Sequence, residues 1–319
     1  MRIVHAVLVL AGLTLAAGCA TGGLRSAAPP SSTVPPDLSA VLGDRTVSVP
    51  GDIGLRQVLV HHPDSAGSRA PLVVVLHGEG GSAEQARDEL GWNAVADREG
   101  FVVAYPEGFN HVWNAGPTCC FPNNSGVNDI GFLNQALSTL TRQDFIDRSR
   151  VYVVGFSVGG SMAYAWECAH PGLLAGIGPV DASLLIRCSV LSPVSVAAVY
   201  GEADRVVRTG GQQDPRPGDT DQALALFRGV DGCPSDPAIV IAGPPATERS
   251  WNCVATHSVS TAIIDGVGHQ WPGIAPMTIP SSGAVAPDAS VSRTDQEPSS
   301  TAFNTDEWLW SHLKNAHSH

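Results

Sequence analysis

The sequence predicts an α/β fold with a mainly parallel central sheet and helices on both faces. Short apolar segments with strand character alternate with segments of helical spacing, which is typical of strand–helix–strand units joined by right-handed crossovers. The segments 71–76 and 151–154 are uninterrupted apolar runs, as expected for strands that are covered on both faces. The third observation is a Gly-x-Ser-x-Gly pentapeptide at 155–159, which lies between a predicted strand and a predicted helix.

The predicted strands are β-branched and apolar runs that are bounded by turn-forming residues. The run at 101–105 is stopped by Pro106, which has no backbone N–H to donate. Strands are predicted at residues 56–62, 71–76, 101–105, 151–154, 194–200 and 260–264.

The predicted helices carry apolar residues three and four positions apart, or begin at a capping residue. Ser82 is able to cap the first helical region, and Asn304 with Glu307 forms a capping pair that opens the last helix. Residues 273–301 are rich in Pro, Ser and Ala, and we predict a long surface loop there. Helices are predicted at residues 82–98, 129–142 and 160–167 and after Asn304.

The N-terminal segment predicts export and lipid anchoring. After a short basic start, residues 3–17 are apolar but too few to span a bilayer as a stable helix. They run into Leu-Ala-Ala-Gly-Cys at 15–19, which resembles a bacterial lipobox whose thiol, here that of Cys19, accepts a diacylglycerol before cleavage. The alternative is an ordinary secretory signal with an incidental cysteine.

This interpretation divides the chain into three parts. Residues 1–18 form a lipoprotein signal peptide, residues 19–43 a lipidated cysteine with a flexible tether rich in Ala, Pro, Ser and Thr, and residues 44–319 one large α/β domain. We therefore expect an extracytoplasmic protein that is anchored to the cell membrane through Cys19 without spanning it.

Charge and composition limit the classes of molecule that this protein is expected to bind. The net charge is −12 and Lys314 is the single lysine, so the chain has no basic patch with which to bind nucleic acid. The cysteines lack the paired C-x-x-C spacing of zinc sites, so we predict no metal. We also predict no cofactor and no obligate protein partner.

The cysteines predict disulfides, because an even number remains in an exported chain once Cys19 is set aside. The last two flank one short segment and are expected to pair with each other. The first two are adjacent, and a bridge between neighbours strains the intervening peptide, so we expect them to reach the middle two in an order that the sequence leaves open. The six are Cys119, Cys120, Cys168, Cys188, Cys233 and Cys253.

The pentapeptide at 155–159 has the context of a nucleophile elbow. Its glycines allow a tight, strained turn, which exposes the Ser157 hydroxyl and directs the N-terminus of the following helix toward the place where an oxyanion would form. The alternative is a Gly-rich strand-to-helix loop that has no catalytic role, and the strand and helix on either side argue against it. Ser157 is therefore the candidate nucleophile.

Two further residues stand where a serine hydrolase needs them. Asp204 and His269 follow predicted strands, and active sites of open α/β sheets gather at the carboxyl ends of strands. The order Ser157, Asp204, His269 is that of the α/β-hydrolases. His269 would take the serine proton while Asp204 holds the imidazole in the required tautomer. Asp181 and Asp265 also lie near predicted strand ends, but their positions favour them less.

The loop at 77–81, His-Gly-Glu-Gly-Gly, resembles an oxyanion loop of the HG type. Two backbone N–H groups, from Glu79 and Val158, are expected to hold the oxyanion. We expect the acidic side chain of Glu79 to point away, because it would oppose the negative charge of the intermediate. His77 is expected to support the loop through its ring.

These blocks, with four others, resemble the polyhydroxybutyrate depolymerase / feruloyl esterase family of secreted esterases, across residues 45–315. The resemblance implies a Ser157–His269–Asp204 triad, ester hydrolysis through an acyl-enzyme, and structural cysteines. The blocks that carry it are His77-Gly78-x-Gly80-Gly81, Tyr105-Pro106-Glu107-Gly108, Trp113-Asn114-Ala115-Gly116 with Cys119-Cys120, Asp129-Ile130-Gly131-Phe132-Leu133, Gly155-Phe156-Ser157-Val158-Gly159-Gly160 and Gly268-His269-Gln270-Trp271-Pro272-Gly273.

Three residues depart from the family pattern. These departures affect the expected identity of the substrate more than the expected reaction. Glu79 stands where relatives often carry Cys or another small residue, Asn128 where Asp is common, and Asp181 where a small residue is usual. The expected substrate is an extracytoplasmic ester, small or polymeric, such as a hydroxyalkanoate or a feruloyl or acetyl ester of a sugar.

Trp113, Phe156 and Trp271 are candidates for an aromatic-accepting cleft, although each is equally suited to core packing. An envelope acyltransferase would use the same residues but exclude water. A peptidase is a further alternative, although the sequence contains no propeller or lid domain. A catalytically silent, lipid-anchored binding protein is the alternative of another class, and the complete set of Ser, Asp and His argues against it.

Overall fold

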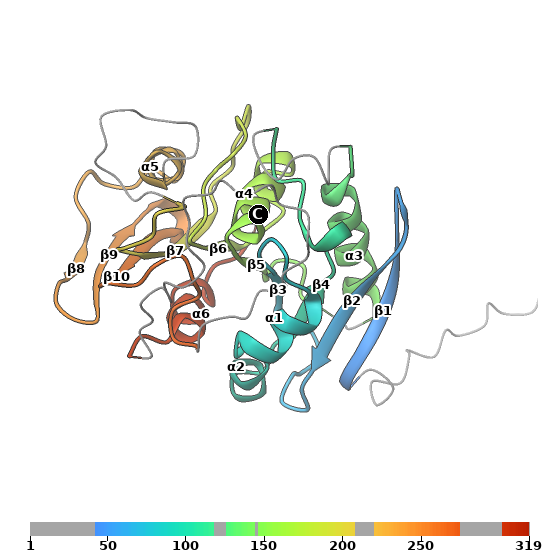
Figure 1. Cartoon of the computed structure of the whole chain (residues 1–319). Helices are drawn as coiled ribbons and strands as arrows, with labels where there is room; N and C mark the ends of the chain where they lie inside the picture. Colours follow the sequence, from blue (N-terminus) through green and yellow to red (C-terminus); the bar gives the residue numbers. More distant parts are fainter. Residues whose placement is uncertain (1–41, 118–125, 144–145, 208–219, 275–301, 319) are drawn as a thin grey trace, which may run out of the picture. The chain divides into compact units, whose positions relative to one another are not determined.

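A ten-stranded sheet organises the computed structural model, which describes residues 42–117, 126–143, 146–207, 220–274 and 302–318. All of these residues belong to one unit, Asp37–His319. The strands follow one another across the sheet in the order β1-β2-β4-β3-β5-β6-β7-β10-β9-β8 (Figure 1). The predicted signal peptide, Cys19 and the tether up to residue 41 fall outside the described residues, and Gly43, the last residue of the predicted tether, is already part of β1.

The strands are β1 (Gly43–Gly51), β2 (Gly54–His62), β3 (Leu72–Leu76), β4 (Val102–Pro106), β5 (Val151–Phe156), β6 (Gly176–Val180), β7 (Ser195–Gly201), β8 (Ile239–Ile241), β9 (Ala246–Asn252) and β10 (Ser258–Ile264). From β4 to β10 every neighbouring pair is parallel, whereas β1, β2, β9 and β8 pair antiparallel at the two sides.

The central strands are parallel, and the helices of their crossover connections cover both faces of the sheet. Every residue of β3, β4, β5, β6 and β7 is buried, which explains why their sequences are continuous apolar runs without polar alternation. β3 pairs with β5 in the register Leu72↔Val151 to Leu76↔Gly155. The carboxyl ends of β3, β5, β6, β7 and β10 therefore lie along one edge of the sheet.

The helices are α1 (Ala83–Glu89), α2 (Trp92–Glu99), α3 (Asp129–Gln143), α4 (Val158–Ala169), α5 (Thr220–Val230) and α6 (Thr305–Leu313) among the described residues. Phe132, Trp166 and Phe227 place α3, α4 and α5 in one core cluster. Ala86, Trp92 and Trp308 place α1, α2 and α6 in the other. Two apolar cores thus lie on opposite faces of the sheet. No helix in the described ranges is long and apolar enough to cross a membrane.

The predicted strands and helices are all present, one of them in a different form, and the structure adds β1, β6, β8, β9 and α5, which were not predicted. The helical region 82–98 is two helices, because Gly91 adopts a φ of 67° between α1 and α2. The caps are as predicted: Ser82 Oγ accepts from the Gln85 N–H and Asn304 Oδ1 from the Glu307 N–H. Most of the predicted loop at 273–301 lies outside the described residues.

β6 was not expected as a strand because its sequence, Gly-Ile-Gly-Pro-Val, lacks strand propensity. The structure shows why small residues are needed there. A Cβ at Gly178 would lie 2.7 Å from Val154 Cγ1, and one at Gly176 would lie 2.8 Å from Leu313 Cδ2 of α6. Close packing against α6 therefore replaces propensity in determining this strand.

Candidate active site

Ser157 occupies a strained turn between β5 and α4, with φ 52° and ψ −119°. Its N–H donates to Val180 O at 2.9 Å, which ties the turn to β6. A Cβ at Gly155 would collide with the Gly159 backbone, and one at Gly159 would collide with the Leu76 carbonyl. Both glycines of the pentapeptide are thus required by close backbone contacts, as a nucleophile elbow demands.

Ser157, His269 and Asp204 form a continuous hydrogen-bonded chain. The Ser157 hydroxyl lies 2.9 Å from His269 Nε2, and His269 Nδ1 donates to Asp204 Oδ2 at 2.9 Å. The other Asp204 oxygen accepts from the backbone N–H groups of Val206 and Val207 at 2.7 and 2.9 Å. The three side chains follow β5, β7 and β10, so the strand ends bring them together from distant positions in the sequence.

The two competing carboxylates have different positions. Asp265 is exposed and its backbone is bonded to Pro245 O, and no described contact joins it to His269. Asp181 is fully buried beside Asp204. Carboxylate oxygens of Asp181 and Asp204 and a ring nitrogen of His269 lie within 4.8 Å of one another. Because backbone N–H groups bind both carboxylates, this cluster is occupied by hydrogen bonds rather than being an open ligand set.

The loop after β3 faces this turn. Gly78 and Phe156 are in close contact, since a Cβ on Gly78 would lie 2.8 Å from Phe156 Cδ1. The Glu79 side chain is exposed. A small pocket is lined by His77, Gly78, Glu79, Gly81, Gln85, Ala86, Leu90 and Phe156. The loop therefore borders the nucleophile turn and forms one wall of a pocket.

His77 fixes the shape of this loop from inside the protein. Its Nδ1–H donates to Gly78 O at 2.7 Å, and its Nε2 accepts from the Gly108 N–H at 2.9 Å. Burial lowers the pKa of His77 to about 4. The ring is thus neutral at pH 7 with one nitrogen donating and the other accepting, which is a supporting role.

The segment at 107–111, which follows β4, clamps the same loop, a role that the sequence did not predict. The His111 carbonyl accepts from the Gly80 N–H at 2.8 Å, and its Nδ1 donates to Gly81 O at 3.0 Å. Glu107 Oε2 accepts from the Ala83 N–H at 2.6 Å. The only feature of the sequence that pointed to this segment was the Tyr105-Pro106-Glu107-Gly108 block, which does not reveal the contacts that the segment makes.

Arg56 and Asp129 form a buried ion pair that holds the clamping segment. Arg56 Nη1 lies 2.6 Å from Asp129 Oδ1, and its Nε and Nη2 donate to Glu107 O at 3.2 and 2.8 Å. The second oxygen of Asp129 accepts from the Asn114 N–H at 2.7 Å. Burial raises the pKa of Asp129 and lowers that of Arg56. Every polar group of the pair thus has a partner, as a buried pair requires.

The structure corrects two of the three aromatic cleft candidates. Trp113 is fully buried and donates from Nε1 to His77 O at 3.0 Å. Trp271 is 1% exposed and donates from Nε1 to Asp306 Oδ1 at 3.0 Å. Both rings are packed in the core because their indole N–H groups have buried partners. Phe156 alone lies at the site, with its ring centroid 5.1 Å from that of His269.

Glu79 and Asn128, two of the residues that depart from the family pattern, lie in different surroundings. Glu79 is exposed and also lines the pocket beside Phe156. Asn128 is also exposed, and its Oδ1 accepts from the Gly131 N–H at 2.8 Å, so it caps the start of α3. Asn128 therefore acts on a helix end and does not line the pocket beside Phe156.

One disulfide prediction is wrong. Cys168 pairs with Cys188, so neither is available to Cys119 or Cys120, which lie outside the described residues. Cys168 lies near the end of α4 and Cys188 follows β6, and their Cα atoms are 5.1 Å apart. The chain between them therefore turns back on itself through a single strand. This pairing needs no contact with the segment around residue 119.

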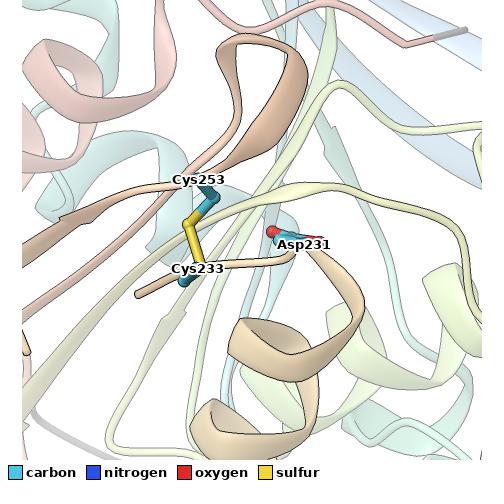
Figure 2. Close-up of side chains that lie close together, drawn as sticks. All are labelled: Asp231, Cys233 and Cys253. Carbon is cyan, nitrogen blue, oxygen red and sulfur yellow. A yellow bond between two sulfur atoms is a disulfide. The ribbon is translucent and has the colours of Figure 1, made fainter. Parts of the chain in front are cut away.

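Cys233 is bonded to Cys253, the pair expected from their short separation (Figure 2). Asp231 lies beside this bridge, and its Oδ1 accepts from the Val194 N–H at 3.1 Å. The three residues are close enough to suggest a metal site. Because the two sulfurs are bonded to each other, neither offers a thiolate, so this donor set does not suit a metal ion.

Comparisons with known proteins agree with this architecture. The family model "Esterase PHB depolymerase" matches residues 55–244. NocK of Nocardia uniformis subsp. tsuyamanensis, a protein named as an esterase, is 31% identical over 83% of this chain and 89% of its own length. Poly(3-hydroxyalkanoate) depolymerase C of Paucimonas lemoignei is 27% identical over 70% of this chain, which spans 59% of that relative.

Among solved structures, the acetyl xylan esterase from Aspergillus awamori superposes with a TM-score of 0.54 at 15% identity, over 74% of this chain and 95% of that one. This likeness concerns the fold, which is that of the α/β-hydrolase esterases. The family model matches more than half of the chain and NocK matches most of it. The chain therefore belongs to the PHB depolymerase family of esterases.

Proposed function

We propose that this esterase hydrolyses carboxylic esters with Ser157 as nucleophile, His269 as general base and acid, and Asp204 as the carboxylate that orients the imidazole. The observation that carries the proposal is the chain of two 2.9 Å hydrogen bonds from Ser157 through His269 to Asp204. A weakly nucleophilic hydroxyl needs such a base, and the base needs a third group to hold its tautomer.

In the first half of the reaction, Ser157 Oγ attacks the ester carbonyl carbon while its proton passes to His269 Nε2. Asp204 accepts from Nδ1–H throughout and stabilises the imidazolium. The tetrahedral intermediate then collapses, His269 returns the proton to the departing alcohol oxygen, and the acyl group remains on Ser157. In the second half, water attacks this acyl-enzyme with His269 again as base, which releases the acid and restores the hydroxyl.

We assign the oxyanion to the backbone N–H groups of Glu79 and Val158. Val158 is the first residue of α4, where a helix leaves its N–H without an intrahelical partner and the helix dipole favours negative charge. The loop that carries Glu79 is held by His77 and His111, so its N–H would be preorganised. Glu79 is exposed, and it takes part in this arrangement through its backbone N–H and not through its carboxylate.

We propose that the substrate is a short-acyl ester outside the cytoplasm, such as a hydroxyalkanoate or a feruloyl or acetyl ester of a sugar. A related protein is named as a poly(3-hydroxyalkanoate) depolymerase. We also propose that lipidation of Cys19 anchors the enzyme, on the strength of the lipobox-like segment at 15–19.

The test of the reaction uses p-nitrophenyl acetate and butyrate without added acceptor. Ser157→Ala should keep the circular dichroism spectrum and lower kcat by about 10⁴-fold or more, because the acyl-enzyme cannot form. A fluorophosphonate should label Ser157 alone in the wild type. Ser161→Ala is the matched control, because Ser161 lies one helical turn later in α4 and is buried, and this variant should stay active and labelled. Full activity of Ser157→Ala, or labelling of another serine, would refute the assignment.

A further inference from the structure

Asp181 is a buried carboxyl group that the proposed reaction does not use. It directly follows β6, its side chain is fully buried, and its φ of 44° is one that residues other than glycine seldom adopt. Strained backbone of this kind persists where surrounding contacts over-determine it, often at functional sites. The strain at Asp181 therefore calls for an account of its contacts.

Asp181 joins three strands of the site. Its N–H donates to Val199 O at 2.9 Å, which binds it to β7. Its Oδ1 accepts from the Gly201 N–H at 2.8 Å, at the end of the strand that leads to Asp204. Its Oδ2 accepts from the Gln270 N–H at 3.1 Å, in the loop that carries His269. One side chain thus fixes the two loops whose mutual position sets the Asp204–His269 bond.

Because Asp181 lies close to Asp204, we expect only one of the two carboxyl groups to carry a charge. Oxygens of both lie within 4.8 Å of each other and of a His269 ring nitrogen, and both carboxyls are buried. Two carboxylates that share such a site cannot both ionise readily. Asp204 accepts from three donors, the backbone N–H groups of Val206 and Val207 and His269 Nδ1–H.

Asp181 has two backbone donors and no cation beside it among the described residues. The titratable groups that face it there are Asp204, from the turn after β7, and His269, from the turn after β10. Burial first, and then the neighbouring Asp204, raises the pKa of Asp181 well above its ordinary value. Asp181 is accordingly the member of the pair that keeps its proton.

We propose that neutral Asp181 is a positioning residue, which donates its carboxyl proton in a hydrogen bond to the Asp204 carboxylate and holds Asp204 against His269. This inference rests on the proposed function, since it assigns Asp181 a role through Asp204.

The direct test needs no substrate. Infrared difference spectra of wild type minus Asp181→Asn at pH 7 should show the carbonyl band of one protonated carboxyl group, which loses intensity on ionisation at high pH. The subtraction removes the other buried carboxyls, because they are common to both proteins. A difference spectrum with a carboxylate band in place of the acid band would overturn the proposal, since Asp181 would then be ionised.

The kinetic test compares Asp181→Asn, which keeps a donor toward Asp204 and one of the two oxygens that accept backbone N–H groups, with Asp181→Gly, which removes the side chain without adding strain at this φ. Asp181→Asn should retain kcat within about threefold, with an unshifted acidic limb of kcat/KM. Asp181→Gly should lose about tenfold or more in kcat with little change in KM. Its acidic limb should move to higher pH, because more of the Asp204 charge then acts on His269.

A purely structural role would lower the melting temperature without moving the pH limb. Equal losses in the two variants, or wild-type kinetics in both, would overturn the proposal. Ser157→Ala, measured in parallel, separates the two levels of inference. If Ser157→Ala is active, the proposed reaction itself fails; if it is inactive while both Asp181 variants behave as wild type, only the role of Asp181 fails.

Discussion

At the residue scale, Asp204 is the carboxylate that the geometry selects to orient His269. In Asp204→Asn, the amide can donate to Nδ1 and so favour the tautomer that carries its proton on Nε2, which cannot accept from Ser157. We expect kcat on a p-nitrophenyl ester to fall by about 10³–10⁴-fold at neutral pH. Asp265→Asn is the control, since Asp265 is exposed and has no described contact with His269. A large loss in Asp265→Asn with near-full activity in Asp204→Asn would reverse the assignment.

Glu167 is a residue whose burial links stability to pH. It is fully buried in α4, and its Oε1 accepts from the Gly172 N–H at 3.0 Å. Burial raises its pKa to about 8, with a smaller contribution from Asp231, whose own pKa burial raises to about 7. A carboxyl whose pKa is higher in the folded state binds its proton more tightly there. The free energy of unfolding therefore falls as pH rises from the ordinary range of a glutamate to about 8.

Glu167→Gln removes this titration but keeps an oxygen for Gly172. Relative to the wild type, the variant should gain stability as pH rises from about 5 to about 8, by on the order of 3 kcal/mol at the upper end. Urea unfolding at a series of pH values measures this difference. Glu84→Gln, at an exposed position on α1, should show a flat difference. A flat profile for Glu167→Gln as well would show that the buried carboxyl does not titrate in this window.

At the scale of elements, the segment that follows β4 acts as a clamp on the loop after β3. His111 adopts a φ of 61°, and its ring donates to Gly81 O. His111→Ala should lower kcat by about tenfold with little change in KM, because the Glu79 N–H would be less well placed for the oxyanion. His111→Asn should restore most of this loss, since Asn tolerates the left-handed conformation and can donate from a similar position. Steady-state kinetics test this, and equal activity in all three proteins would exclude the clamp.

The strands that could be predicted are those whose sequence alone determines burial on both faces. β3 and β5 are continuous apolar runs, whereas β6 depends on close packing by glycines against α6, which no local pattern reveals. β8 and β9 were not predicted because their own sequences carry too little strand character. β8 has only three residues, all exposed, and β9 has mixed burial, so neither carries a clear periodic signal.

The same distinction applies to the site. Ser157, Asp204 and His269 could be placed at strand ends because each follows a recognisable strand, and the structure brings them within hydrogen-bond distance. Arg56 and Asp129 could not be paired in this way, because Arg56 begins a predicted strand and Asp129 a predicted helix, so neither lies at the carboxyl end of a strand. The Cys168–Cys188 pair did carry a signal, since its sequence separation of 20 equals that of Cys233–Cys253.

At the scale of the whole molecule, the proposed anchor predicts where the enzyme is found. Cys19→Ala should abolish incorporation of labelled fatty acid and move the enzyme from the membrane to the soluble fraction, because no acyl chain then attaches. Fractionation with a high-salt wash measures this, with Ser157→Ala as an inactive control that stays with the membrane. Retention of Cys19→Ala in washed membranes would contradict the anchor.

The order of strands across the sheet has a consequence for how the enzyme matures. Ser157 and His269 are separated by 112 positions in sequence, and His269 reaches the site only after β10 has paired with β7. Contacts of such long sequence separation form slowly, and a growing chain folds from its N-terminal part first. A partly made chain would thus hold the elbow without His269, the proposed base, and we expect it to be inert. Regained ester hydrolysis during refolding therefore reports the docking of the last parallel strand.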